Sequence, residues 1–273
     1  RYGVRTSSVV RGGERIGTYF LETGASQRGS SVIYDRTNSA FSSLSPDELD
    51  LERLAEETTW FHWSGITPAL GEPARRTVQA LCNSVQEADG TVSCDLNYRA
   101  KLWSEEDAQR VMRPLMEHVD FCIAGRGDPF SVLGIEDPQK GPPTVEVKEK
   151  AYAQVLQDMK EEFGFQGAAM TLRESWSAST NGWSALYIDD RDCPSPYRSA
   201  HYEIDLVDRV GGGDAFSAGL IYGLREKADS RWAVEFAIAA SALKQTMPGD
   251  ANLATQEEIE RLMDGGESGR VRR

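Results

Sequence analysis

The feature that most constrains the fold is an alternation of short apolar strands and capped helices between residues 60 and 123. Strand-like runs occupy residues 60–66, 91–99 and 119–123, and helical spacing fills the intervals 72–89 and 104–118. Because each strand is followed by a helix, successive strands are expected to return parallel to one another in one sheet. The sequence therefore predicts an α/β fold with a doubly wound, mostly parallel sheet.

Two capping boxes mark further helix starts. Ser45 with Glu48 predicts a helix that runs to about residue 58, and Thr255 with Glu258 predicts the last helix. Apolar spacing predicts helices at 145–163 and 231–245, and strands at 168–172, 183–188 and 199–207. The segments 138–143 and 265–273 are expected to be a loop and a frayed tail.

The first 40 residues have a different character, since they alternate like strands without intervening helices. Residues 15–22 and 31–36 are β-branched and aromatic, and a Gly/Ser-rich turn joins them. Their outward positions carry Tyr19, Tyr34 and Arg36, a mixture that is unusual for a plain core face. The pattern alone leaves two interpretations open, an exposed amphipathic hairpin and a ligand-contacting pair of strands.

Polar side chains follow the strand at 91–99. Asp95, Asn97 and Arg99 stand at its carboxyl end, which is where open α/β sheets bind their ligands. Arginine offers a two-pronged fork to a carboxylate, so this end suits an acidic small molecule. An ordinary solvated strand-end loop is the alternative interpretation.

Three consecutive glycines open a helix of small residues in the segment 208–224, which reads DRVGGGDAFSAGLIYGL. Glycine tolerates positive φ, so Gly211, Gly212 and Gly213 are expected to present unpaired N–H groups to an anion. Asp214 comes next, and a carboxylate beside an anion site is unfavourable unless it has a chemical task. The task that fits is removal of a proton from a hydroxyl that attacks a bound phosphate. A Gly-rich helix start with a capping aspartate is the structural alternative.

Charge and cysteine content exclude several classes of protein. The 273 residues include 30 basic and 43 acidic side chains, a net charge of −13, which argues against a nucleic acid or an anionic membrane as partner. No apolar run approaches the ~18 residues of a membrane span. The four cysteines lie far apart without a Cys-x-x-Cys motif, so reduced thiols in a cytoplasmic protein are expected. The three histidines are isolated and show no metal-binding spacing.

The glycine segment, with Asp208 upstream and Asp214 at its end, resembles the C-terminal signature of ribokinase-like carbohydrate kinases. Four other stretches resemble the 2-keto-3-deoxygluconate kinases of that family: Tyr-Phe-Leu-Glu-x-Gly at 19–24, Val-Ile-Tyr-Asp-Arg at 32–36, Ser-Gly-Ile-Thr-Pro-Ala-Leu at 64–70, and Asp-Leu-Asn-Tyr-Arg at 95–99. The resemblance covers nearly the whole chain. It implies an enzyme that phosphorylates a sugar acid with ATP and Mg²⁺. The gluconate and galactonate derivatives, which differ at one hydroxyl, both remain open.

The resemblance also implies a division of the chain. Residues 1–40 would form strands of a small β lid, residues 41–264 the ribokinase-like core, and residues 265–273 a flexible tail. Lid strands in this family often pair between subunits, so a homo-oligomer is an expected partner.

Site roles follow position by position from the resemblance. Asp214 would be the catalytic base, and the three glycines before it the anion hole. Arg173 and Ser175 would contact the nucleotide, and Asp128 would help hold Mg²⁺ through water. The expected substrate contacts are Tyr19, Tyr34, Arg36, Asn97, Arg99 and Asp250.

Two departures from the family favour a second hypothesis. The chain starts without Met and lacks the family's first ~60–70 residues, as counted against the family's pattern, so we expect that an N-terminal part is missing. In addition, Gly125 stands where the family has the Asn of Asn-x-x-Glu, which leaves only Asp128 of that motif. The second hypothesis is a non-catalytic ribokinase-like fragment or pseudo-kinase that binds a ligand or partner without turnover.

Overall fold

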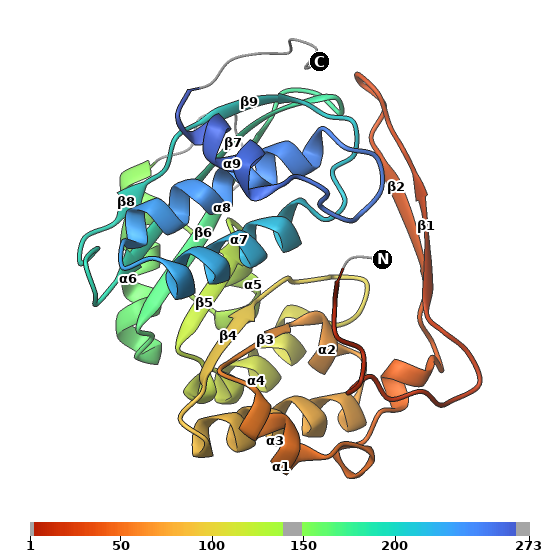
Figure 1. The fold of residues 1–273 in the computed structure, drawn as a ribbon. Coiled ribbons are helices and arrows are strands. Elements are labelled where there is room, and N and C mark those ends of the chain that lie inside the picture. Colours follow the sequence, from red (N-terminus) through yellow and green to blue (C-terminus); the bar gives the residue numbers. More distant parts are fainter. Residues whose placement is uncertain (1–2, 139–148, 266–273) are drawn as a thin grey trace. The chain divides into compact units, whose positions relative to one another are not determined.

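The structure, a computed structural model, describes residues 3–138 and 149–265 (Figure 1). The chain divides into two compact units. Unit 1 comprises residues 1–22, 31–137 and 159–166, and unit 2 comprises residues 23–30, 138–158 and 167–273. The predicted division into a lid, a core and a tail concerns the function of these segments, so it stays a prediction. The expected loop at 138–143 and the tail lie almost entirely outside the described residues.

Unit 1 contains a parallel sheet, as the strand–helix alternation predicts. Its strands are β3 (Trp60–Ser64), β4 (Thr91–Asp95) and β5 (Phe121–Gly125), paired in that order. Its helices are α1 (Leu51–Glu57), α2 (Ile66–Ala69), α3 (Glu72–Glu87), α4 (Glu105–Leu115) and α5 (Asp128–Leu133). Figure 1 shows α1 and α3 side by side beneath β3 and β4.

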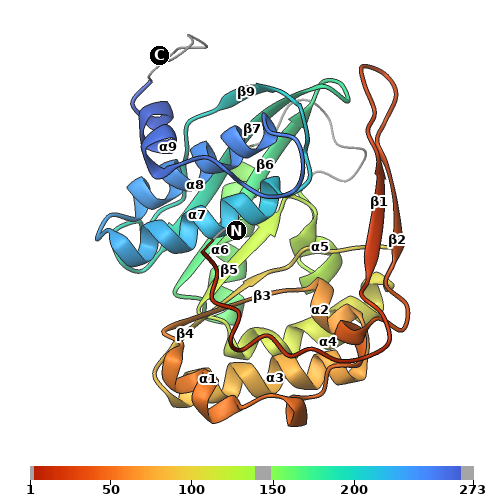
Figure 2. The ribbon, with the colours of Figure 1, turned by 45° about the vertical axis from the view of Figure 1, so that its right-hand side comes forward.

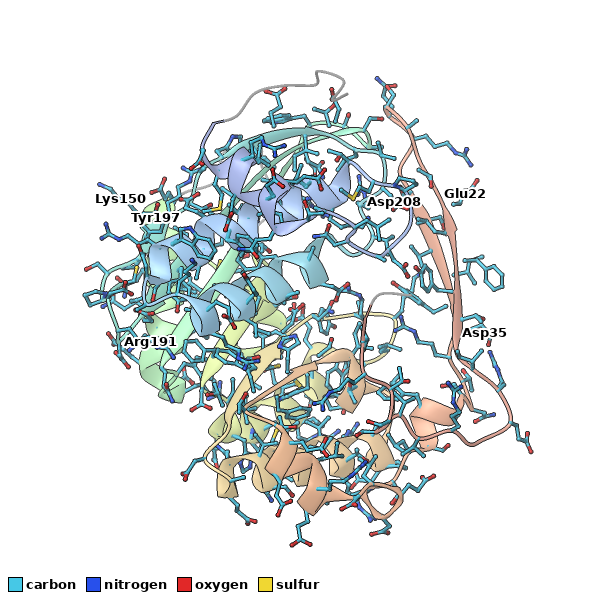
Figure 3. All side chains as sticks on the ribbon, viewed as in Figure 1. Glu22, Asp35, Lys150, Arg191, Tyr197 and Asp208 are labelled. Carbon is cyan, nitrogen blue, oxygen red and sulfur yellow. The ribbon has the colours of Figure 1, made fainter. Side chains whose placement is uncertain are left out.

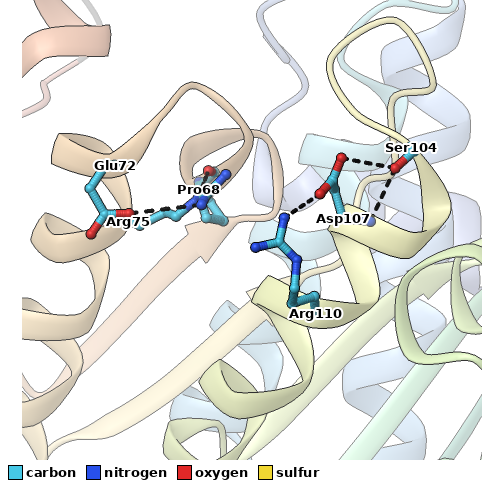
Figure 4. A network of polar contacts seen from close by, with 6 residues as sticks. All are labelled: Pro68, Glu72, Arg75, Ser104, Asp107 and Arg110. Atoms are coloured by element: carbon cyan, nitrogen blue, oxygen red, sulfur yellow. Dashed lines mark hydrogen bonds and ion pairs between the residues drawn. The ribbon is translucent and has the colours of Figure 1, made fainter.

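The helix starts of unit 1 depend on polar side chains (Figure 4). The hydroxyl of Ser104 accepts the backbone N–H of Asp107 at 3.1 Å and so caps α4. Asp107 also pairs with Arg110 one turn on, while Arg75 of α3 lies 3.8 Å from Glu72. These exposed pairs contribute little individually, and the caps satisfy backbone groups that a helix start leaves free.

The predicted helix after Ser45 is wrong in its extent. The capping box forms, but it closes only a 3₁₀ turn at Pro46–Glu48. Leu49 then takes an extended conformation with φ −111° and ψ 141°, and Asp50 starts α1 by accepting the N–H of Arg53. A second cap within five residues therefore divides the predicted helix in two.

The strands β1 (Thr18–Glu22) and β2 (Ser31–Asp35) form the predicted antiparallel hairpin (Figure 2). Tyr19 is opposite Tyr34 on one face, and Phe20 is opposite Ile33 on the other. Phe20 and Ile33 are 63% and 66% exposed. The hairpin thus presents an apolar outer face that the described part of unit 1 leaves uncovered.

The strands of unit 2 pair antiparallel. They are β6 (Gly167–Ser175), β7 (Thr180–Asp189), β8 (Tyr197–Arg198) and β9 (Tyr202–Asp205), with β7 pairing each of the others. The helices here are α7 (Gly212–Glu226), α8 (Ser230–Gln245) and α9 (Gln256–Met263), and α6 (Glu149–Phe163) spans the boundary between the units. The predicted capping box of Thr255 is present at α9.

Helices α7 and α8 lie side by side (Figure 1) because small residues line their contact. A Cβ atom on Gly219 would lie 2.8 Å from the Cα of Ala237. One on Gly223 would lie 2.5 Å from the Cα of Ala233. Only glycine permits such an approach, which fixes α7 closely against α8.

One buried carboxylate organises the loop between β7 and β8. Asp189 is fully buried, and its Oδ1 accepts the backbone N–H groups of Arg191 at 3.1 Å and Cys193 at 2.9 Å. Its Oδ2 accepts the hydroxyls of Tyr187 and Ser230. Figure 3 labels Arg191 in this loop. A buried carboxylate is tolerated here because its oxygens are satisfied by donors from the loop, β7 and α8.

The four cysteines are buried and free, as expected of reduced thiols. Cys82, Cys94 and Cys122 belong to unit 1 and Cys193 to unit 2. Burial raises the pKa of Cys82 to about 12 and raises the pKa values of the other three thiols. Among the described helices, none is both long and apolar enough to cross a membrane.

Candidate active site

The start of α7 has the geometry that the glycine run predicts. Gly211 is the N-cap, with φ +83° in the left-handed region. A Cβ atom there would lie 2.1 Å from the carbonyl oxygen of Asp250, so glycine is required both by φ and by space. A Cβ on Gly213, by contrast, would meet nothing within 4 Å. The third glycine therefore faces open space while the first is tightly packed.

Among the described residues, the backbone donors that this helix start leaves free come from its first turn. The N–H of Gly212 donates to the carbonyl of Arg209 at 3.3 Å, and Ala215 already donates to Gly211 at 2.9 Å. Gly213 and Asp214 lie between them, where a helix has no preceding carbonyl to offer. Together with the helix dipole, these two N–H groups are suited to an anion.

Asp214 is the third residue of α7 and is exposed. It is not the cap of its helix, because Gly211 is the N-cap and makes no side-chain capping bond. Within the described part of unit 2, its carboxylate has no hydrogen-bond partner. The capping alternative is therefore not supported, and the carboxylate is available to a ligand.

The other predicted residues of unit 2 fall in two places. Asp250 follows α8, and its backbone carbonyl lies against Gly211, so the structure brings it to the helix start. Arg173 and Ser175 end β6, and both are exposed. Ser175 is opposite Asn181 in the pair of β6 with β7. Trp176, 40% exposed, follows Ser175 and was not predicted as a site residue.

The strand-end group of unit 1 lies after β4. Asn97 adopts φ +42°, and its side-chain amide donates to the hydroxyl of Ser64 at 3.1 Å. Arg99 donates to the carbonyl of Tyr98 at 2.9 Å. Positive φ is unusual for a residue other than glycine, so Asn97 marks a sharp turn at the carboxyl end of the strand.

Asp128 begins α5, and its carboxylate is occupied by backbone groups. Its Oδ2 accepts the N–H of Gly125 at 2.7 Å, and its Oδ1 accepts the N–H of Tyr98 at 3.2 Å. Burial raises the pKa of the Asp128 carboxyl, and these two N–H groups oppose that effect. Among the described residues, no group of three or more His, Cys, Asp or Glu side chains could hold a metal ion. The contacts of Asp128 fit a structural link between β4 and β5 and do not fit a direct metal ligand.

Unit 1 contains a cleft of about 890 Å³. Its lining includes Tyr34 and Arg36 from the predicted substrate residues, and Lys101, which was not predicted. The guanidinium of Arg36 lies 4.4 Å from the centre of the Tyr34 ring, and the ammonium of Lys101 lies 6.0 Å from it. Two cations beside one aromatic ring make this cleft suited to an anion.

Not every predicted substrate residue lines the cleft. The rings of Tyr19 and Tyr34 are 6.5 Å apart, but Tyr19 is not among the lining residues, nor are Asn97 and Arg99. Glu14 also lines the cleft and adds one acidic group. The sequence signal for Lys101 was its place two residues after Arg99, beyond the stretch that resembles the family.

Comparison with known proteins supports the prediction from the glycine segment. The chain is 32% identical over 255 residues to a 2-dehydro-3-deoxygalactonokinase from Haloferax volcanii, covering 93% of this chain and 72% of that one. It is 28% identical to a 2-dehydro-3-deoxygluconokinase from Thermoproteus tenax, covering 96% and 72%. A crystal structure of the 2-dehydro-3-deoxygluconokinase from Thermotoga maritima matches with a TM-score of 0.90 and 45% identity, covering 96% of this chain and 77% of that one.

Fold and matches together define an ATP-dependent carbohydrate kinase that resembles the 2-dehydro-3-deoxygluconokinases, and the predicted ribokinase-like α/β fold is confirmed. The model of the pfkB family of carbohydrate kinases matches residues 1–163 and 185–257, and the chain belongs to that family. The chain spans about three quarters of the length of these relatives.

Proposed function

We propose that the protein transfers the γ-phosphate of ATP to the terminal hydroxyl of 2-keto-3-deoxygluconate or a close sugar acid. The observation that carries this proposal is the position of Asp214, an exposed carboxylate in the first turn of α7, directly after the glycine loop. Relatives named for kinases of 2-dehydro-3-deoxy sugar acids support the substrate class.

The chemistry follows from this arrangement. Asp214 accepts the proton of the substrate hydroxyl, whose oxygen forms a new bond to the γ-phosphorus while the bond from that phosphorus to the ADP oxygen breaks. The N–H groups of Gly213 and Asp214 stabilise the negative charge on the transferring group, and Gly211 holds the loop in the required conformation. Arg173 and Ser175 are proposed as nucleotide contacts, because both are exposed at the end of β6.

The cleft of unit 1 supports an acidic substrate. The protein's net charge of −13 opposes the approach of an anion, so local cations must offset it. Arg36 and Lys101 supply two such cations in one cleft. We propose that Arg36 and Tyr34 contact the carboxylate end of the sugar acid. Contacts from Tyr19, Asn97, Arg99 and Asp250 remain predictions.

This proposal includes Mg²⁺ only as an ion bound to the nucleotide. The oxygens of Asp128 already accept backbone N–H groups, so no step is assigned to a metal held by this residue. Magnesium commonly binds through substrate phosphates with few protein ligands, which agrees with this arrangement. A role for Asp128 through a bridging water remains a prediction.

A second copy of the chain is proposed as a partner. Phe20 and Ile33 face outward from the β1–β2 hairpin and are opposite each other in register. Pairing two such faces would bury this apolar surface. A dimer mass in light scattering that reverts to the monomer in Phe20→Glu would support it. The buried free thiols are consistent with the proposed cytoplasmic location.

The test is steady-state kinetics of Asp214→Asn with ATP and 2-keto-3-deoxygluconate. Loss of the base should lower kcat by about 10²–10⁴-fold with nucleotide binding unchanged. Asp107→Asn, another first-turn aspartate, serves as the matched control and should keep wild-type kcat. Wild-type turnover by Asp214→Asn would refute the assignment. Equal kcat/KM of the wild type for the sugar acid and its neutral counterpart would refute the substrate class.

A further inference from the structure

A lysine in unit 2 is buried beside the glycine loop, although the mechanism above does not use it. Lys244, near the end of α8, has 0% exposure. Its ammonium donates to the backbone carbonyl of Asp208 at 3.2 Å and to that of Met247 at 3.4 Å. Burial lowers the pKa of this lysine, and the nearby Asp208 and Asp250 carboxylates oppose that effect. A buried ammonium is costly, so its retention requires an explanation.

The two carbonyls belong to two different segments. Asp208 begins the loop that leads to α7, and Met247 lies in the turn that follows α8. The carboxylate of Asp208, labelled in Figure 3, joins the same two segments. It accepts the N–H of Val210 at 3.0 Å and the N–H of Gly249 at 3.0 Å. One cation and one anion therefore link the glycine loop to the turn at residues 246–250.

This link leaves the loop little freedom. A Cβ on Gly211 would lie 3.3 Å from the Cε of Lys244 and 2.1 Å from the carbonyl oxygen of Asp250. The loop is thus packed against both the lysine stem and the turn. Two carbonyl oxygens that point at one place repel each other unless a donor or cation lies between them. Removing the ammonium would therefore allow the loop and the turn to separate.

We propose that Lys244 is a positioning residue for phosphoryl transfer, a fixed internal cation that holds the loop 208–214 so that the N–H groups of Gly213 and Asp214 stay in place. The inference depends on the proposed function of that loop as the anion hole. Lys244 does not touch the reacting atoms, and it acts through the backbone of Asp208 and Met247.

The test compares two variants that remove the charge in different ways. Lys244→Ala removes the ammonium and leaves a space of the length of propylamine. Lys244→Met removes the ammonium and fills most of that space. Both should lower kcat by about 10²-fold, the usual effect of a small misplacement near the reacting groups, with a smaller change in KM for the sugar acid. Lys227→Met, at an exposed lysine of the same unit, should leave both constants unchanged.

Chemical rescue separates a positioning role from a merely structural one. Propylammonium should restore at least about 10-fold of the lost kcat in Lys244→Ala and none in Lys244→Met, because methionine occupies the space. Tetramethylammonium at equal concentration controls for ionic strength. Wild-type kcat in folded Lys244→Met, or equal recovery with both salts, would overturn the proposal.

Hydrogen exchange provides a readout that does not depend on catalysis. The hydrogen-bonded amides of this loop, those of Asp208, Val210 and Gly212, should exchange at least about 10-fold faster in Lys244→Met than in wild type, while those of α9 should not change. If Lys244→Ala does not fold, exchange in Lys244→Met decides the question, and unchanged protection of the loop overturns the proposal. If the wild type has no sugar-acid kinase activity, the proposed function fails, but the exchange experiment still tests the link.

Discussion

Acid should destabilise unit 1 through one half-buried imidazole. His62 lies in β3, and its Nδ1 is 2.8 Å from the hydroxyl of Ser93 in β4. The same hydroxyl oxygen accepts the indole N–H of Trp60 at 2.8 Å, so its own hydrogen is available to donate to Nδ1. This arrangement fits a neutral ring, and burial lowers the pKa of His62 to about 4.

The direction of the pH effect follows from proton binding. Between about pH 6.5 and pH 4 the unfolded chain binds a proton at His62 and the folded chain does not. The contribution of the neutral His62 ring to the free energy of unfolding is therefore complete above pH 6.5 and is lost as the pH falls toward 4. The difference in pKa corresponds to about 3 kcal/mol in the limit of low pH, and about 2 kcal/mol of it should be lost between pH 7 and pH 5.

The measurement is urea unfolding followed by tryptophan fluorescence at pH 7, 6 and 5, for wild type and His62→Asn. The asparagine amide oxygen can still accept the Ser93 hydroxyl, but it does not titrate. The free energy of unfolding of the wild type should fall by about 2 kcal/mol more than that of the variant across this range. Titration of the His62 ring by NMR provides a direct check, since the chain has only three histidines. Parallel stability curves, or a titration midpoint near 6.5, would refute the reasoning.

Three further predictions rest on single residues. Gly211→Ala should abolish activity and lower the Tm, because φ is +83° at this residue and a Cβ would meet a carbonyl oxygen at 2.1 Å. Gly213→Ala should fold with the wild-type Tm, because a Cβ there meets nothing within 4 Å, and similar Tm values for the two variants would contradict this reasoning. Asp189→Ala should lower the free energy of unfolding by at least about 3 kcal/mol, measured in urea, because it leaves several buried donors without an acceptor; a loss under about 1 kcal/mol would show that water replaces the carboxylate. Arg36→Met should raise KM for the sugar acid by about 10–100-fold and leave a neutral analogue unaffected, as steady-state kinetics can establish; equal changes for both would remove Arg36 from acid recognition.

Local signals were sufficient to predict most elements of the fold. The parallel strands of unit 1, the hairpin and the cap of Thr255 all agree with the structure, because each depends on residues close in sequence. Helices α2 and α5 are absent from the prediction, because the strand predicted at 60–66 runs into the start of α2 and Gly125–Asp128 is interpreted as a departure from a motif. For α5, Pro129 at its first turn and Gly134 in the left-handed conformation at its end are the available signals.

The candidate site was predicted less completely, for a physical reason. Asp214 and the glycine run are consecutive, so their geometry is local and the sequence predicts it. Lys244 appears in the sequence as an ordinary cation in the last turn of a helix, and only the turn that folds back over it makes it buried. Lys101 likewise becomes a cleft residue only through the position of β2. A local sequence pattern does not indicate whether tertiary contacts will bury a charged residue.

The four buried thiols can serve as probes of local unfolding of the protein. Since a thiolate reacts with an alkylating reagent and burial raises the pKa values of all four, labelling of the folded protein should be slow. Three of the sulfurs lie in unit 1 and Cys193 alone lies in unit 2. Mass spectrometry can give the order in which the four cysteines are alkylated, with and without ATP or a sugar acid. This order therefore measures separately how each ligand restrains unit 1 and unit 2.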